Sequence, residues 1–113
     1  MTEDIIFRII LHAGNARSEA YDALRAAQAG DFVAASGHLQ QAEAEFTIAH
    51  RAQSDTIQRE AGGQQCTITL LAVHAQDHLM TAVAEKSLIE NMIEMYKTIR
   101  DLAAKLEACS CHR

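Results

Sequence analysis

The 113-residue chain contains no proline and no tryptophan, and aromatic residues make up only 4% of it. Proline breaks the interior of helices, so its absence leaves long uninterrupted helices open to this sequence. Hydrophobic residues still account for 49%, and many of them are alanine, the strongest helix former. A core built from such small side chains needs thin helices at close range. The composition therefore predicts a single all-α domain.

A basic surface is also missing, because the net charge is −5 and acidic and basic residues are interspersed. Proteins that bind nucleic acid or anionic membranes do so through clustered lysine and arginine, so both partner classes are disfavoured. The apolar run from Ile5 to Leu11 is interrupted by Arg8 and follows no basic segment. This pattern predicts neither a signal peptide nor a membrane span. We expect a cytoplasmic protein with no membrane insertion.

Cysteine is scarce, with Cys66, Cys109 and Cys111 as the whole set. An odd number with two members at one end does not resemble a disulfide framework, and reduced thiols fit a cytoplasmic protein. The segment Cys109-Ser110-Cys111-His112-Arg113 matches no recognised zinc-ligand spacing. We expect a domain over residues 1–108 and an exposed tail over 109–113.

The first helix is predicted from Glu3 to Ala29, because isoleucine, alanine and leucine recur there at helical spacing. Thr2 supplies a capping side chain at its start. Gly14 lies inside the pattern. We expect a kink there, or a point where another backbone comes close.

The second helix is predicted to follow Gly30 and Asp31, a helix stop and an N-cap in succession, and to reach Ala61. Its expected inward row alternates three- and four-residue steps: Phe32, Ala35, Leu39, Ala42, Phe46, Ala49, Gln53 and Ile57. Gln53 is polar on this row, and a polar residue on such a seam often fixes register or oligomeric state.

The third helix is predicted from Thr67, as its N-cap, to Ala108, after a break at Gly62-Gly63. At about 1.5 Å per residue it would be roughly 60 Å long, longer than either other helix. One apolar row is Ile68, Leu71, Ala75, His78, Ala82, Ile89, Met92, Tyr96, Ile99, Ala103 and Leu106. A second row beside it is His74, Thr81, Leu88, Met95 and Leu102.

The expected fold is thus a three-helix antiparallel up-down-up bundle with a long third helix. Two shorter helices cannot cover such a broad apolar stripe. Further copies of the chain are the simplest cover, through coiled-coil-like packing.

The most unusual residues of the chain are His74, Asp77 and His78, which share one face of the third helix. Two imidazoles and a carboxylate are costly to bury unless they have partners. The simplest interpretation makes them incidental polar residues of a helical oligomerisation or adaptor module.

Three functional interpretations stand beside it. His74, His78 and Asp77 offer ligands to a transition metal in a histidine-rich metal-binding protein. The zinc-protease helix motif, however, needs glutamate where this chain has Ala75. General acid–base catalysis, with Asp77 orienting a histidine, lacks an accompanying nucleophilic serine or cysteine in a strained turn. A phosphohistidine carrier needs only an accessible imidazole, which is a competent nucleophile because its ordinary pKa is about 6.5.

Four segments occur in an order typical of one family: 13–18 (AGNARS), 27–32 (AQAGDF), 49–53 (AHRAQ) and 73–81 (VHAQDHLMT). Together they make most of the chain, from Ile6 to Leu102, similar to the lactose/cellobiose (N,N′-diacetylchitobiose) IIA proteins of the bacterial phosphoenolpyruvate:sugar phosphotransferase system. The segment around the two histidines is the most specific of the four.

This resemblance implies a homotrimer of three-helix subunits. Each subunit would accept a phosphoryl group from HPr and pass it to a cysteine of IIB, which phosphorylates the sugar that membrane IIC imports. The family's phosphohistidine corresponds to His74, its metal-binding aspartate to Asp77, and a pocket histidine to His78. Three Asp77 carboxylates at a threefold axis would repel one another unless a hard cation such as Mg²⁺ neutralised them.

Three further polar residues are expected near that site: Gln53 at the trimer seam, and Gln76 and Thr81 in the pocket. We expect partner proteins to dock on an apolar surface around Leu79 and Met80. The segment resembles the cellobiose/chitobiose branch slightly more than the lactose branch. The sequence does not identify the transported sugar, because the resemblance implies that a IIA protein does not contact it.

Overall fold

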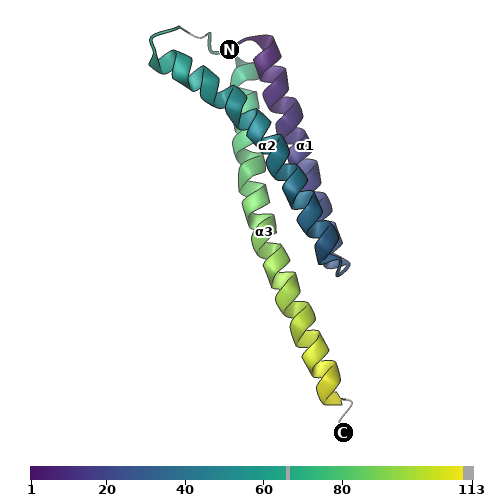
Figure 1. Ribbon diagram of the computed structural model, residues 1–113. Helices are drawn as coiled ribbons and strands as arrows, with labels where there is room; N and C mark the ends of the chain where they lie inside the picture. The colour runs from purple at the N-terminus through teal and green to yellow at the C-terminus, as the bar shows by residue number, and fades with distance from the viewer. Residues whose placement is uncertain (66, 111–113) are drawn as a thin grey trace.

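The computed structural model describes residues 1–65 and 67–110 and consists of three helices: α1 (Glu3–Gln28), α2 (Phe32–Ala61) and α3 (Leu70–Ser110). Figure 1 shows α1 and α2 as an antiparallel hairpin, with α3 running beside it and continuing far beyond the α1–α2 turn. The molecule measures 73 × 20 × 19 Å. The predicted up-down-up arrangement with a long third helix is confirmed. None of the described helices is both long and apolar enough to cross a membrane.

The ends of α1 and α2 follow the predicted capping residues. The Thr2 hydroxyl accepts a hydrogen bond from the Ile5 amide at 3.3 Å, and the Asp31 carboxylate accepts one from the Ala34 amide at 3.0 Å. Gly30 between the two helices has φ +84°, a left-handed conformation that favours glycine. The helix stop and start predicted at this turn are therefore confirmed.

The start of α3 differs from the prediction, because Thr69 rather than Thr67 caps it. The Thr69 hydroxyl accepts a hydrogen bond from the Ala72 amide at 3.1 Å, which leaves Leu70 as the first helical residue. At the other end α3 continues to Ser110, so the first two residues of the expected tail are helical. Cys66 and the segment 111–113 lie outside the described residues.

Alanine dominates the core, as its abundance predicted. One cluster of buried residues lies around Leu79, and a second lies nearer the α1–α2 turn. The fully buried alanines include Ala13, Ala16, Ala20, Ala42 and Ala75. Their small side chains let α1 pack closely against both other helices, whereas α2 and α3 touch each other little.

One inward position of α2 was predicted wrongly. Ile57 is 54% exposed, and Thr56 is buried in its place, donating its hydroxyl hydrogen to the Ala52 carbonyl at 3.1 Å. On α3, the predicted apolar row contains exposed residues such as Met92 and Ile99, as expected of a stripe too broad for the hairpin to cover. The inward row of α3 is Ala72, Ala75, Leu79, Ala82, Ile89 and Ile93. A helix that is apolar on two faces does not reveal from its spacing which face meets the hairpin.

Leu79 is also fully buried, so it cannot belong to the expected docking surface, whereas its neighbour Met80 is 54% exposed. Gly14 marks neither a kink nor a close approach by another backbone, so both expectations for it were wrong. A Cβ at that position would lie 3.5 Å from Nε2 of His78, and α1 continues unbroken through it.

Candidate functional site: a histidine pair on α3

The rings of His74 and His78 stack in parallel near the start of α3, with centroids 6.2 Å apart and planes inclined by 9°. The four-residue separation on a helix places both side chains on one face, as predicted. His74 is exposed, and His78 is half-buried beside Gly14 of α1. A reacting partner can therefore reach the first imidazole, while the second is held against α1.

Asp77 lies between the two histidines in sequence and is exposed. Its carboxylate makes no side-chain hydrogen bond or ion pair within residues 1–65 and 67–110. Both oxygens are therefore available to an external group. This donor type fits a hard divalent cation.

The other three predicted site residues are less closely gathered. The side-chain amide of Gln53 donates to the Gln76 side-chain oxygen, which joins α2 to α3 within one chain. Gln76 also lines a hollow of about 220 Å³ that includes Ile57 and Val73, but neither histidine. Thr81 is exposed on α3. The polar position on the α2 seam is thus paired inside the chain.

A hollow of about 600 Å³ opens beside His78, between α1 and α3. It is lined by Gly14, Arg17, Ser18, Tyr21, Arg25 and His78. The α1 residues lie on successive turns, so one helix supplies two guanidinium groups and two hydroxyls next to the second imidazole. Hydrogen-bond donors of this kind suit an anionic group.

Glu85 on α3 accepts hydrogen bonds from two of the residues that line this hollow. Its carboxylate accepts a hydrogen bond from the Tyr21 hydroxyl at 2.5 Å, and Arg17 Nε lies 3.0 Å from both carboxylate oxygens. The Tyr21 hydrogen bond, followed by the Arg17 bond and charge, holds the pKa of Glu85 below its usual value. The same hydrogen bond raises the pKa of Tyr21. Glu85 is therefore an anion at neutral pH, and it attracts positive charge on His78.

Sequence reasoning missed this network, although a signal was present. Arg17 and Tyr21 are four residues apart on α1, and Glu85 lies seven residues after His78, which returns it to nearly the same face of α3. Each residue is an ordinary surface residue by type. Only the pairing of α1 with α3 brings the three side chains together.

A row of exposed apolar side chains follows the histidine segment down α3: Leu88, Met92, Met95, Ile99, Leu102 and Leu106. Their steps alternate four and three residues, and Asp77 lies eleven residues, or about three helical turns, before Leu88. Such spacing is typical of a coiled-coil seam. The aspartate therefore lies on the same stripe as an apolar face that the hairpin leaves open.

These features define a class: an all-α three-helix protein with an accessible histidine pair and an uncovered heptad stripe. The family model of the PTS system lactose/cellobiose-specific IIA subunit matches residues 4–97. The chain belongs to this family. It is accordingly a IIA component of the sugar phosphotransferase system, and thus a phosphotransferase.

Similar proteins agree with this assignment. The lichenan-specific phosphotransferase enzyme IIA component of Bacillus subtilis (strain 168) is 50% identical over 99 residues, covering 88% of this chain and 90% of that protein. The crystal structure of the PTS cellobiose-specific enzyme IIA from Bacillus anthracis has a TM-score of 0.86 at 41% identity, covering 89% of this chain and 94% of that one. The solution structure of the Escherichia coli IIA(chitobiose)–HPr complex gives 0.76 at 37% identity, with 87% and 95% covered.

Proposed function

We propose that His74 carries the phosphoryl group, receiving it from HPr and passing it to a cysteine of the cognate IIB protein in the cytoplasm. The observation that supports this is the position of His74. It is exposed, stacked 6.2 Å from the half-buried His78 and one turn from the exposed Asp77, in a chain of the IIA family. The similarity to a IIA component solved in complex with HPr supports the choice of donor.

The chemistry requires little beyond this arrangement. A lone pair on a His74 ring nitrogen attacks phosphorus, forming one P–N bond as the P–N bond to the HPr histidine breaks. In the second step that new bond breaks while a cysteine thiolate of IIB forms a P–S bond. No water enters either step, so the group is transferred rather than lost.

The residues beside His74 have separate tasks in this proposal. His78 offers a ring N–H to a phosphoryl oxygen, and Glu85 stabilises positive charge on that ring. Arg17 and Tyr21 fix the Glu85 carboxylate by three contacts of 2.5–3.0 Å. They act on the phosphoryl group only through Glu85 and His78, so they are positioning residues.

Phosphoryl labelling tests the assignment of His74. The purified protein is incubated with phosphoenolpyruvate, enzyme I and HPr, and its intact mass is measured. The wild-type chain should gain one acid-labile phosphoryl group, and His74→Gln should gain none. His50→Gln is a matched control, because His50 is exposed on α2, and it should label as wild type does.

His78→Gln separates the carrier from the supporting histidine. It should still reach full labelling, but more slowly, by about tenfold to a hundredfold if it removes one charge-assisted contact worth roughly 1.5–3 kcal/mol. Full labelling of His74→Gln at the wild-type rate would refute the proposal.

The same proposal includes a homotrimer. The apolar stripe from Leu88 to Leu106 extends past the end of the hairpin, where no other part of residues 1–65 and 67–110 covers it. Three copies aligned on this stripe would bury it, with Asp77 on the same face. Asp77 would then hold Mg²⁺ or a similar cation, which supplies neutralising charge for the carboxylates and for the phosphoryl group nearby.

Asp77→Leu tests the role of the metal. It should remain a folded trimer and lose the dependence of its assembly on divalent cation, as measured by light scattering with and without chelator. A monomeric Asp77→Leu variant would count against the proposal. Leu102→Lys, by contrast, should weaken the trimer in either metal condition, because it places charge inside the seam.

The transported sugar is proposed only as a class. The similar proteins are named for lichenan, cellobiose and chitobiose, which share β-linked sugar units. We assign this chain to the uptake of such β-linked oligosaccharides. Phosphoryl transfer from the labelled chain to candidate IIB proteins tests the class, since only the cognate IIB should be phosphorylated rapidly.

A further inference from the structure

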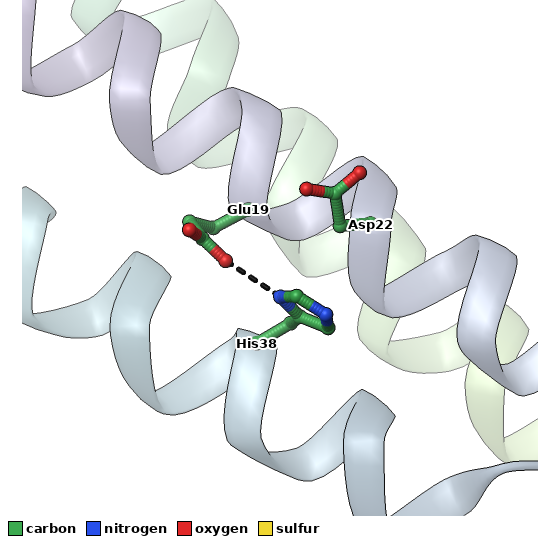
Figure 2. A group of neighbouring side chains, drawn as sticks. All are labelled: Glu19, Asp22 and His38. Atoms are coloured by element: carbon green, nitrogen blue, oxygen red, sulfur yellow. Dashed lines mark hydrogen bonds and ion pairs between the residues drawn. The ribbon is translucent and has the colours of Figure 1, made fainter.

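We propose a second metal site, for a zinc-like divalent ion, formed by Glu19, Asp22 and His38 between α1 and α2. Figure 2 shows the two carboxylates one turn apart on α1 and the His38 ring pointing toward them from α2. Nδ1 of His38 lies 2.7 Å from Oε2 of Glu19. One donor atom from each of the three residues lies within 4.8 Å of the others. None of them belongs to the histidine pair on α3.

The donor set selects the class of ion. One imidazole nitrogen and two carboxylate oxygens suit Zn²⁺ and neighbouring transition metals, whereas Mg²⁺ prefers oxygen ligands alone. Three protein ligands also leave room for water on the ion. Two carboxylates this close repel each other, and a bound cation relieves that repulsion.

The side chains need to move only slightly to bind such an ion. Ligands at about 2.0–2.2 Å from a tetrahedral Zn²⁺ are roughly 3.3 Å apart. The Glu19–His38 contact must therefore open a little, and Asp22 must approach. The three side chains are 30%, 39% and 43% exposed for Glu19, His38 and Asp22, so each has freedom to adjust. The Asp22–Arg25 ion pair, at 2.5 Å, is exposed and thus easily given up.

A second histidine–glutamate pair between α1 and α2 serves as a comparison for this site. His12 and Glu45 form the same kind of pair across α1 and α2, at 2.5 Å. That pair lies seven residues away on each helix, with the histidine and the glutamate exchanged between helices. Among the described residues, no second carboxylate completes a three-ligand group there. A role in holding α1 against α2 is enough to explain both histidine–glutamate pairs. Such a role does not require the additional carboxylate of Asp22.

Zinc titration of the full-length chain tests the site, with competition against a chromophoric chelator at neutral pH. Cys109 and Cys111 are replaced by serine in every sample, so that tail thiols do not contribute. Asp22→Asn is the decisive variant, because it removes a charged ligand and leaves the contact between His38 and Glu19 intact. We expect one zinc equivalent to bind at least tenfold more weakly in Asp22→Asn and in His38→Asn. His12→Asn should bind as the parent does.

Circular dichroism establishes that each variant is folded. An unchanged zinc titration in both Asp22→Asn and His38→Asn would overturn the proposal, as would an equal loss in His12→Asn. Anomalous diffraction at the zinc edge provides an independent readout, since the ion should lie against His38 and both carboxylates. Labelling of His74 is not expected to change in Asp22→Asn, so failure of this proposal leaves the phosphocarrier proposal untouched.

Discussion

Replacing Leu79 by alanine should destabilise the protein severely, while the same change at the next residue should not. Leu79 is 0% exposed, and Met80 is 54% exposed. The two residues are neighbours in sequence and similar in volume and hydrophobicity. They differ in which face of α3 they occupy, so the pair isolates the effect of burial.

The magnitude follows from the surroundings of Leu79. Its cluster contains several alanines, among them Ala13, Ala16 and Ala75, which have no side-chain rotamers with which to fill a cavity. Leu79→Ala should therefore lie in the upper part of the usual range, at about 3–5 kcal/mol. For a chain of this size, such a loss lowers the melting temperature by on the order of 10–20 °C. Met80→Ala should change stability by about 0.5 kcal/mol or less.

Thermal unfolding followed by circular dichroism measures both changes. All samples are compared at one protein concentration, because the stability of an assembling protein depends on concentration. Equal shifts for the two variants, or a larger shift for Met80→Ala, would mean that α3 presents a different face to the hairpin from the one described. The assignment of the outward stripe would then fail as well.

Two further variants test local features. Glu85→Gln should destabilise the protein by about 1 kcal/mol at neutral pH, since it weakens the contacts with Tyr21 and Arg17. Because folding lowers the pKa of Glu85, its contribution is present above the ordinary value and is lost as pH falls through the folded value. The difference in melting temperature between wild type and Glu85→Gln should therefore shrink in acid, and a constant difference would contradict the assignment. Gly30→Ala should cost about 1–2 kcal/mol by urea unfolding, because φ is +84° there. Gly37 lies in open space on α2, so Gly37→Ala should instead stabilise the protein by roughly 0.5–1 kcal/mol. Equal effects at both glycines would refute the claim that the turn requires glycine at position 30.

Local signals predicted the helices well, because each end is fixed by side chains close in sequence. Thr2 and Asp31 cap the helices that follow them, and Gly30 turns the chain between α1 and α2. The N-cap of α3 was placed two residues early, since two threonines there are equally able to cap. The choice of Thr69 depends on which hydroxyl meets the Ala72 amide.

Long-range contacts were much harder to predict. The shared face of His74 and His78 follows from helical spacing alone, and the structure confirms it. The link from Gln53 to Gln76 and the approach of Arg17 to Glu85 depend on how the helices are paired. Residues from separate helices have no fixed spacing in the sequence, so no local pattern reveals their contact.

The sequence by itself determined the helical class, the turn at Gly30 and the family, and it predicted that His74 and His78 share one helix face. Composition is read directly from the chain, and capping and helical spacing depend on residues only a few positions apart. The tertiary structure alone decided which apolar face of α3 meets the hairpin, burying Leu79 and leaving Leu88 outside. It also brought Glu85 to Tyr21, and Asp22 to His38. Both faces of α3 are apolar, so their hydrophobicity does not distinguish them. The distinction comes from shape, since the alanines of α1 accept only one of the two faces at close range.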